Sequence, residues 1–486
     1  MNGHLLMAFL LFTGFSRSFD IFMPEAEFDK VLRGGSLDGF ITAKEFWAII
    51  GDIRRTETNA LYLSTPMSIG RSYEKRSLDA FYITDNTSQL PNYQQTKNII
   101  LFTSVHHSRE PLSLTMIVLM VREILKLVRG AGHNKMKELL RDNIIFFLPI
   151  MNVDSYVYIN ENYFGAHSKQ IRMIRKNRHG TPGCADWLGG VDLNRNYDMK
   201  FGMDEEGSSS NPCSEDYRGI RPFSEPETSA LKAYVDSHPN IVSDVNIHTY
   251  GNAWIYPYNY VRDKNNHLLE QKNRLFFDFY NEFTSQIHKK DMRALFGNAA
   301  FALDYSTNGE AGDWFTGKKH ILNIDVELGN PDPRSEEFYP PQSILADIVR
   351  YNWVAMKEYL YRHVVEFTHR VVLFRSQANF EVINRSISGL LGSRLFFEPV
   401  FDGEVYSGSY ETRYCIKDLM TDTCHSVKRF SGSFQEDIRG RHVLEVQLVF
   451  KNPQDLQRLQ GLKMRIQRPH PYLNYRDQHY LFKKSA

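Results

Sequence analysis

The sequence predicts an α/β domain whose sheet is covered by helices on both faces, followed by a small all-β domain. Between about residues 40 and 363, short apolar runs typical of buried strands alternate with longer amphipathic stretches typical of helices. Such alternation is characteristic of a sheet with helices packed on both faces. After about residue 364, apolar and polar residues alternate with a period of two. We therefore expect an α/β domain over 19–363 and a β-rich domain, in the form of a sandwich, over 364–486.

Residues 1–18 are predicted to be a secretory signal peptide. Residues 5–15 are mostly apolar but too few to cross a bilayer as a helix, and small residues at Ser16 and Ser18 suit cleavage after Ser18. Because no Lys or Arg precedes the apolar stretch, a buried N-terminal helix is the alternative. No later stretch has the pattern of a membrane span, and we expect a secreted or luminal protein.

The individual elements follow from the same periodicities. The expected strands of the α/β sheet are 98–105, 143–148, 241–247 and 321–326. The expected helices are 112–129, 226–237, 265–288 and 342–361. In the C-terminal region the expected strands are 371–374, 394–397, 443–450 and 462–466. Ligands of α/β sheets bind beyond the carboxyl ends of strands, so site residues should directly follow the strands of the first set.

Composition excludes several classes of protein. Of the 486 residues, 42% are hydrophobic and 24% are charged, as in ordinary globular proteins and unlike collagen-like, coiled-coil or disordered chains. The 58 Lys and Arg residues balance 57 Asp and Glu residues, which gives a net charge of +1. Because there is no strong basic bias, we expect no nucleic-acid partner.

The four cysteines form two local pairs, Cys184 with Cys213 and Cys415 with Cys424. In a secreted protein this pattern predicts two disulfides, with free thiols as the alternative. Asn86-Thr-Ser and Asn384-Arg-Ser are acceptor sequences for N-glycans in such a compartment, so a glycoprotein is expected.

Two histidines and a glutamate are predicted to share one edge of the sheet. His107 and Glu110 follow one predicted strand, and His248 follows another. His-x-x-Glu alone is common by chance, but the three side chains together form the His₂Glu set of a catalytic zinc site, which leaves a fourth position for water. Glu327 lies at the end of a third strand and is not needed as a ligand, so it is the candidate base for that water.

A polar segment between these strands supplies further candidates. Asp192 could accept a hydrogen bond from a zinc-bound imidazole. Asn194 and Arg195 offer the planar, charge-assisted donors that bind a carboxylate. Residues 170–178 are strongly basic and are expected either to form a solvated face or to line one side of a groove.

With these residues in place, the sequence resembles the zinc carboxypeptidase family, to which the pancreatic carboxypeptidases A and B belong. The resemblance spans roughly residues 40–360, with the motifs in the family's order. The motifs are His107-x-x-Glu110, Arg172-x-x-Arg175, Gly190-Val-Asp-Leu-Asn-Arg-Asn196, Ile247-His248-x-Tyr250, Tyr305 upstream of Asp313-Trp314, and Val326-Glu327-Leu-Gly. The resemblance implies a mixed sheet flanked by helices, and a zinc-dependent metallocarboxypeptidase with one Zn²⁺ per chain.

The resemblance also implies the chemistry of the reaction. His107, Glu110 and His248 would bind zinc. Glu327 would deprotonate the zinc-bound water and later pass the proton to the leaving amine. Arg175 would stabilise, with the zinc, the oxyanion of the tetrahedral intermediate.

Substrate binding is implied in the same way. Asn194, Arg195 and Tyr305 would bind the terminal carboxylate of a peptide or protein, which makes the enzyme an exopeptidase. Arg109 and Arg172 would guide or bind the substrate further out. The expected protein is a monomer that needs no partner other than these C-termini.

The residue before Asp313 lies at the floor of the family's specificity pocket, where an aliphatic residue suits apolar C-termini and an acid suits Lys or Arg. Here it is Gly312, which predicts an empty floor and, between Asn259 and Ala300, a roomy pocket. Glu310 is expected either to face solvent or to turn inward and favour basic residues. We therefore expect a broad preference for large apolar residues that extends to Lys and Arg if Glu310 turns inward.

The carboxypeptidases A and B carry a folded N-terminal inhibitory segment, and too few residues lie between the predicted cleavage site and the region that resembles the family to form one here. We therefore expect an enzyme that is synthesised in its active form. Two other functions are kept as alternatives. One is an inactive zinc-binding or adhesion protein in which the β-rich domain carries recognition. The other is a relative that trims γ-glutamyl or cell-wall peptides.

Overall fold

The computed structural model describes residues 20–364, apart from the side chains of residues 274 and 275. Beyond residue 364 it describes the strands β9–β17, with side chains only at 459 and 460. The predicted signal peptide with its cleavage site, the Asn384 side chain and the Cys415–Cys424 pairing lie outside the described residues.

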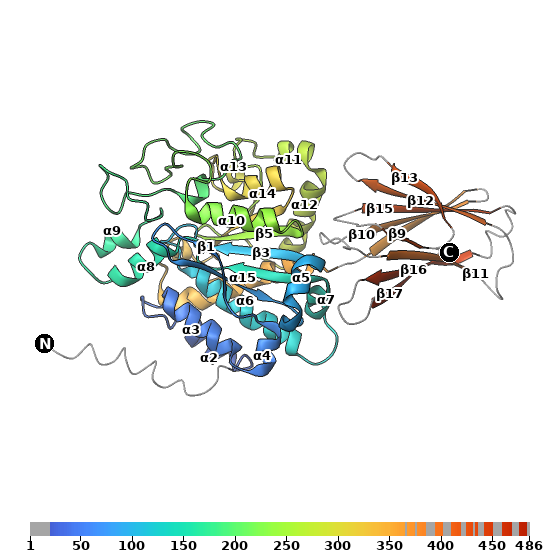
Figure 1. Ribbon diagram of the computed structural model, residues 1–486, viewed down its shortest axis with the longest axis horizontal. Helices are drawn as coiled ribbons and strands as arrows, with labels where there is room; N and C mark the ends of the chain where they lie inside the picture. Colours follow the sequence, from blue (N-terminus) through green and yellow to red (C-terminus); the bar gives the residue numbers. More distant parts are fainter. Residues whose placement is uncertain are drawn as a thin grey trace.

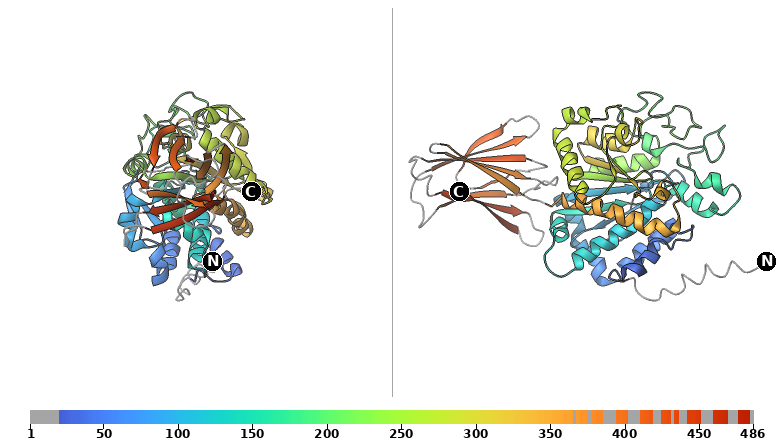
Figure 2. Two further views of the ribbon diagram at one scale, coloured as in Figure 1. Left: turned by 90° about the vertical axis from the view of Figure 1, so that its right-hand side faces the viewer. Right: turned by 180° about the vertical axis from the view of Figure 1, so that it is seen from behind.

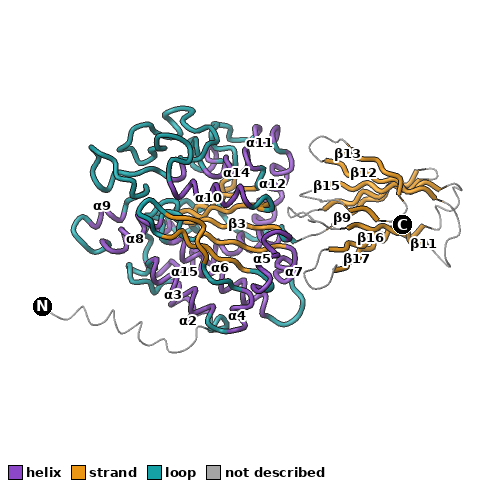
Figure 3. The backbone as a smooth tube through the Cα atoms, in the orientation of Figure 1, coloured by secondary structure: helices purple, strands orange, loops and turns teal. Residues whose placement is uncertain are grey.

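A mixed eight-stranded sheet forms the centre of the first part (Figure 1; Figure 3). Its strand order is β1-β2-β4-β3-β5-β8-β6-β7. The strands are β1 Met67–Arg71, β2 Ser77–Ile83, β3 Asn98–Ser104, β4 Asn143–Leu148, β5 Ile241–Thr249, β6 Ala253–Ile255, β7 Leu295–Gly297 and β8 Leu322–Leu328. The predicted α/β class, with a mixed sheet, is therefore confirmed.

The four strands expected from the sequence lie side by side in the middle of this sheet. β4, β3, β5 and β8 are parallel to one another, whereas β2 pairs antiparallel with β4, β1 pairs antiparallel with β2, and β6 pairs antiparallel with β8. In this register Ser104 faces Ile247, and His248 faces Glu327. The carboxyl ends of β3, β5 and β8 therefore meet at one edge, as the site prediction requires.

Helices flank both faces of the sheet. Figure 1 shows α10 and α14 on one side of it and α6 and α15 on the other. The helices are α2 Glu25–Leu32, α3 Ala43–Arg54, α4 Glu57–Tyr62, α5 Leu90–Thr96, α6 Leu112–Arg129, α7 Lys135–Asp142, α8 Val153–Asn162, α9 Ser168–Arg172, α10 Pro226–Ser237, α11 His267–Lys272, α12 Arg274–His288, α13 Ala299–Ala302, α14 Ala311–Lys319 and α15 Leu345–Tyr361. Short 3₁₀ turns lie at Thr87–Gln89, Leu193–Arg195, Pro333–Ser335 and Gln342–Ile344. Within the described residues, no helix combines the length and the hydrophobicity needed to cross a bilayer.

Helix boundaries depart from the prediction at one place. The single helix expected over 265–288 is divided into α11 and α12 at Asn273, which has φ −151° and ψ 75°. The Asn273 side chain accepts a hydrogen bond from the backbone N–H of Phe276 and so caps α12. An asparagine can serve as an N-cap in the middle of a helical pattern, which periodicity alone does not reveal.

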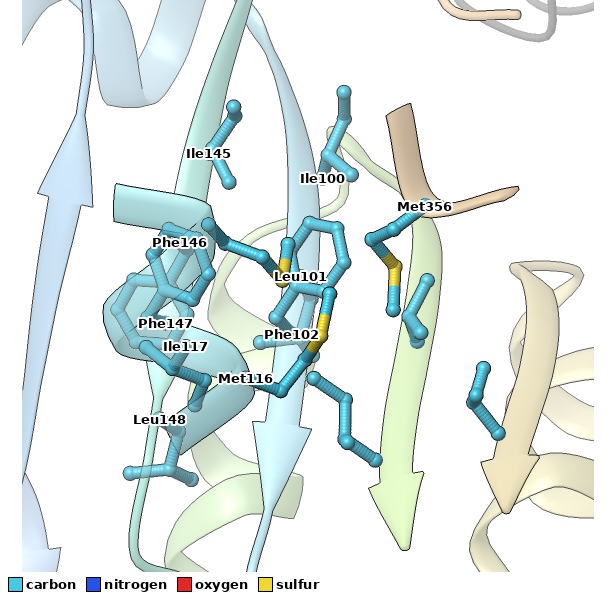
Figure 4. Close-up of a cluster of buried hydrophobic side chains, with 14 of the residues drawn as sticks. Ile100, Leu101, Phe102, Met116, Ile117, Ile145, Phe146, Phe147, Leu148 and Met356 are labelled. Atoms are coloured by element: carbon cyan, nitrogen blue, oxygen red, sulfur yellow. The ribbon is translucent and has the colours of Figure 1, made fainter. Parts of the chain in front are cut away.

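The hydrophobic core lies between the central strands and the helices on both faces of the sheet. Figure 4 shows Leu101 and Phe102 of β3 among side chains of β4, with Met116 of α6 and Met356 of α15 packed against them. These residues are fully buried. Because β3 and β4 are buried along their whole length, their sequences read as continuous apolar runs rather than alternating ones.

The C-terminal strands form two antiparallel sheets, ordered β13-β12-β15-β10-β9 and β14-β11-β16-β17 (Figure 2). They are β9 Phe367–Phe374, β10 Gln377–Asn384, β11 Arg394–Phe401, β12 Tyr410–Asp418, β13 Cys424–Phe430, β14 Ser433–Gln435, β15 His442–Phe450, β16 Leu459–Arg468 and β17 Arg476–Lys483. The four runs expected in this region all fall within strands. A separate sandwich domain stays a prediction.

Candidate metal and active site

The candidate ligands lie just beyond the carboxyl ends of β3 and β5. The chain leaves β3 through Val105, whose φ of 51° is rare for a β-branched residue, and then presents His107 and Glu110. His248 lies near the carboxyl end of β5, where β5 pairs with β8. All three predicted ligands therefore lie at, or a few residues beyond, the carboxyl ends of strands of the central sheet.

The structure brings the three predicted ligands together. Ligand atoms of His107, Glu110 and His248 all lie within 4.8 Å of one another, and the three side chains are buried. Glu110 holds both imidazoles, with Oε1 2.8 Å from His107 Nδ1 and Oε2 2.9 Å from His248 Nδ1. Burial alone would raise the pKa of Glu110, but the two imidazoles lower it below its ordinary value.

This donor set fits zinc. Two imidazole nitrogens and one carboxylate are the protein ligands of a catalytic zinc site with one position left for water or substrate. The Nδ1 atoms of both histidines converge on the same carboxylate, while the Nε2 atom of His107 faces Asp192 at 3.2 Å. An imidazole whose second nitrogen is bound to a carboxylate is the arrangement that orients metal-binding histidines.

Asp192 joins the metal residues to Arg175. Its carboxylate is fully buried and accepts hydrogen bonds from Arg175 Nε at 2.9 Å and from the backbone N–H of Asn194 at 2.9 Å. Burial opposes the charge of Asp192, but Arg175 and His107 hold its pKa well below the ordinary value. Burial likewise opposes the charge of Arg175, whereas Asp192 and Glu110 raise the pKa of that guanidinium.

Glu327 ends up beside the ligands through the pairing of β5 with β8. Its backbone is opposite that of His248. Burial and the neighbouring Glu110 raise the pKa of Glu327 well above its ordinary value, and Arg175 and Arg195 oppose this shift. A carboxylate in this position can accept a proton next to the metal residues, which is what the sequence predicts for a general base.

The predicted carboxylate-binding residues are also close to this group. Asn194 Oδ1 accepts a hydrogen bond from the backbone N–H of Ala311 at 3.0 Å, which fixes the side-chain amide. Arg195 is buried and donates to the carbonyl oxygens of Gly207 and Asn194. The Tyr305 side chain is 42% exposed, as expected for a residue on a surface loop.

The remaining arginines are less closely connected to the ligands. Arg109 donates to Glu215 and stacks on Phe338, and Arg172 stacks on Tyr163. Arg178 contacts Tyr158, so the three regularly spaced arginines of the basic segment point to different neighbours. Because α9 ends at Arg172, the helical repeat that would align them does not continue. Of the three, Arg175 is the one that reaches the metal residues.

The specificity pocket differs from its prediction. A Cβ atom at Gly312 would lie 2.5 Å from Asn323 Oδ1 and 2.9 Å from Asp325 Oδ2, so the floor is occupied by these side chains rather than empty. Glu310 is buried, which excludes the solvent-facing orientation. Asn323 and Asp325 were not among the residues that the sequence singled out. Their positions, four and two residues before Glu327 on one strand, are the signal that could have revealed them.

One of the two predicted disulfides lies within the described residues. Cys184 and Cys213 are bonded, with a Cα–Cα distance of 5.4 Å. The bridge closes the loop that carries Asp192, Asn194 and Arg195, and so limits the movement of the segment that holds them.

Comparison with known proteins places the chain in a family. The model of the family described as zinc carboxypeptidase matches residues 52–355, more than half of the chain. The chain belongs to the zinc carboxypeptidase family. It is 30% identical to carboxypeptidase A1 of Mus musculus over 297 residues, which are 60% of this chain and 64% of that relative. It is 28% identical to carboxypeptidase O of Bos taurus over 296 residues, which are 58% of this chain and 68% of that relative.

Two solved structures share the fold of this chain. Bovine thrombin-activatable fibrinolysis inhibitor matches with a TM-score of 0.53 and 24% identity over 68% of this chain and 99% of that one. Carboxypeptidase A of Helicoverpa armigera matches with a TM-score of 0.52 and 23% identity over 69% of this chain and 80% of that one. The chain spans less than two thirds of the mouse carboxypeptidase A1 that it matches.

Proposed function

We propose that this chain is a zinc metallocarboxypeptidase that removes single residues from the C-termini of peptides and proteins. The observation that carries the proposal is the convergence of His107, Glu110 and His248 within 4.8 Å, beside Glu327. One zinc ion per chain would be held by these three ligands. When bound, it would supply a Lewis acid that polarises the scissile carbonyl and makes water more acidic.

The chain's own residues would carry the proton and the charge. Glu327 would accept a proton from the attacking water and deliver it to the nitrogen of the leaving residue. Arg175, fixed by Asp192, would donate hydrogen bonds to the oxygen on which negative charge develops. Held donors of this kind stabilise a transition state without having to reorganise during the reaction.

The same geometry supports exopeptidase rather than endopeptidase activity. Asn194 and Arg195 lie on a 3₁₀ turn directly after Asp192, so donors for a free α-carboxylate are at a fixed distance from the metal residues. Tyr305 would close over the substrate, and Arg109 and Arg172 would interact with more distant parts of the peptide. A substrate without a terminal carboxylate would lack these interactions.

Four further features belong to this proposal. The disulfide Cys184–Cys213 supports an oxidising compartment, secreted or luminal, entered through a signal peptide. The strands after residue 364 would form a separate all-β domain. The enzyme would act as a monomer. The side chains around Gly312 narrow the broad C-terminal preference that is expected from the sequence.

The proposal is tested with a pair of peptides that differ only at the C-terminus. The zinc-loaded full-length protein is incubated with a peptide that has a free C-terminal carboxylate and with the same peptide as its C-terminal amide, and the products are identified by mass spectrometry. We expect stepwise loss of single residues from the free acid, abolished by a chelator and restored by zinc. Internal cleavage, equal cleavage of the amide, or chelator-insensitive turnover would refute the proposal.

A further inference from the structure

Three acidic side chains surround Gly312 and carry no counter-charge. Glu310, Asp313 and Asp325 are 3%, 0% and 4% exposed. None of the lysines, arginines and histidines for which the structure describes a side chain forms a salt bridge with any of them. Burying a charged group without a partner is costly, so such a cluster calls for an explanation.

Two of the three carboxylates are held by the protein itself. Glu310 accepts hydrogen bonds from the Asn259 amide and from Thr307 Oγ1. Asp313 accepts bonds from the backbone N–H groups of Asn259 and Tyr260 at 2.9 and 3.1 Å. Both side chains therefore have structural partners, and they hold the loop after β6 against the start of α14.

Asp325 is different, because one of its oxygens is unused. Asp325 Oδ1 is buried and has no hydrogen-bond partner among the described residues, and the same is true of Asn323 Oδ1. Asp325 Oδ2 lies 2.9 Å, and Asn323 Oδ1 2.5 Å, from the place that a Cβ at residue 312 would take. Two acceptor side chains thus point at Gly312, a position in α14 that lacks a side chain.

These acceptors face the reaction site. Asn323, Asp325 and Glu327 alternate along β8, so their side chains project from one face of the strand. Asp325 is two residues from Glu327, a separation of about 6.6 Å along a strand. On the other side, Ala311 next to Gly312 is hydrogen-bonded to Asn194. Asp325 therefore lies beside the place where the terminal residue of a bound peptide would extend.

A metal ion does not fit this cluster. Among the side chains described for residues 20–364, His107, Glu110 and His248 are the group of three or more that converges closely enough to hold an ion. The carboxylates around Gly312 do not converge on one point, and the floor also contains the amide oxygen of Asn323. An extended cation with several N–H donors matches such a set better, because it can bond Asp325 and Asn323 at once.

We propose that Asp325, with Asn323 beside it opposite Gly312, binds the cationic side chain of a C-terminal Lys or Arg and makes this chain selective for basic residues. The inference rests on the proposed carboxypeptidase function. The flexible stem of Lys or the longer guanidinium arm of Arg spans the distance from the reacting bond to Asp325. Glu310 and Asp313 add negative charge around the bound cation. A large apolar side chain would instead leave Asp325 buried and unpaired.

Gly312 has a specific part in this arrangement. Any side chain at residue 312 would collide with the oxygens of Asn323 and Asp325. The glycine therefore allows two acceptors from β8 to occupy the floor of the pocket. The residue that selects the last side chain of the substrate is therefore Asp325 of β8 and not residue 312 of α14.

The test uses substrate pairs of nearly equal shape and different charge. The zinc-loaded full-length enzyme is assayed on peptides identical except for a last residue of arginine or citrulline, and of lysine or norleucine. We expect kcat/KM for the cationic member of each pair to be higher by on the order of 100-fold. In Asp325→Asn, which keeps the size of the side chain, the ratio within each pair should approach one.

A matched control is Glu227→Gln, which also removes a buried carboxylate but at the start of α10, and it should keep the wild-type ratios. Equal rates on arginine and citrulline peptides in the wild type, or unchanged ratios in Asp325→Asn, would overturn the proposal. If no peptide of the panel is shortened, the carboxypeptidase proposal itself fails. Calorimetric titration with free L-arginine and L-citrulline then still tests the site: tighter binding of arginine supports it, and equal binding overturns it.

Discussion

Replacing Asp192 by Asn should weaken zinc binding although Asp192 does not touch the metal. The Asp192 carboxylate accepts bonds from His107 Nε2 at 3.2 Å, from Arg175 Nε at 2.9 Å and from the backbone of Asn194 at 2.9 Å. An amide of the same size offers one acceptor oxygen instead of two, and it carries no charge. Either the imidazole or the guanidinium therefore loses its partner in the buried site.

The size of the effect follows from this loss. Removing a partner that orients a metal-binding histidine typically lowers metal affinity about 10- to 100-fold, which corresponds to about 1.4–2.7 kcal/mol. The affinity is measured by competition with a zinc-binding fluorescent chelator at fixed pH. The matched control is Asp186→Asn, because Asp186 also pairs with an arginine, Arg178, but its side chain is 59% exposed. Zinc affinity in Asp192→Asn within twofold of the wild type would refute the role assigned to Asp192.

Three further predictions concern stability. Burial raises the pKa of Glu227 to about 7. The protonated group therefore stabilises the fold, and this stabilisation is lost as the pH rises from the ordinary pKa of a glutamate through about 7. Urea unfolding of Glu227→Gln should lack this pH dependence, worth about 3 kcal/mol in the wild type; parallel pH profiles of the two proteins would contradict it. Cys184→Ser removes the Cys184–Cys213 bridge, which joins residues 29 apart in the sequence, and should lower the free energy of unfolding by about 3.5 kcal/mol. An unchanged free energy of unfolding would show that the bridge does not constrain the chain. Gly190→Ala should be destabilised by more than about 2 kcal/mol, because Gly190 has φ 95° and its added Cβ would lie 2.0 Å from the Asn177 carbonyl oxygen. Thermal unfolding at the wild-type temperature would exclude that strain.

The parts of the site that the sequence could predict are those carried by strand ends. β3 is a nearly continuous apolar run, whereas β5 and β8 are buried strands in which polar residues are interspersed, and His107, His248 and Glu327 are polar residues at or just beyond their carboxyl ends. Parallel pairing then brings them together without any further information. Asp192 could be predicted only as a hydrogen-bond acceptor, since nothing in its own segment reveals that both His107 and Arg175 would reach it.

The parts that could not be predicted depend on long-range packing. The sequence leaves open whether Glu310 faces solvent or the interior, and its orientation is decided by Asn259, which is distant in the sequence, together with the nearby Thr307. Gly312 reads as an empty position because a sequence does not show that β8 side chains fill the space opposite it. Asp325 is missed for the same reason: it is one of the polar residues that alternate with apolar ones along β8, and only the packing of β8 against α14 shows what it faces.

The central claim is that Glu327 moves the proton in a reaction that the zinc site makes possible. It is tested most directly by Glu327→Gln, with zinc content and the rate of C-terminal residue release measured on the same preparation. We predict wild-type zinc content and a rate lower by about 10²- to 10⁴-fold, because the amide cannot accept the proton. A variant that binds zinc normally and releases C-terminal residues at the wild-type rate would contradict the account.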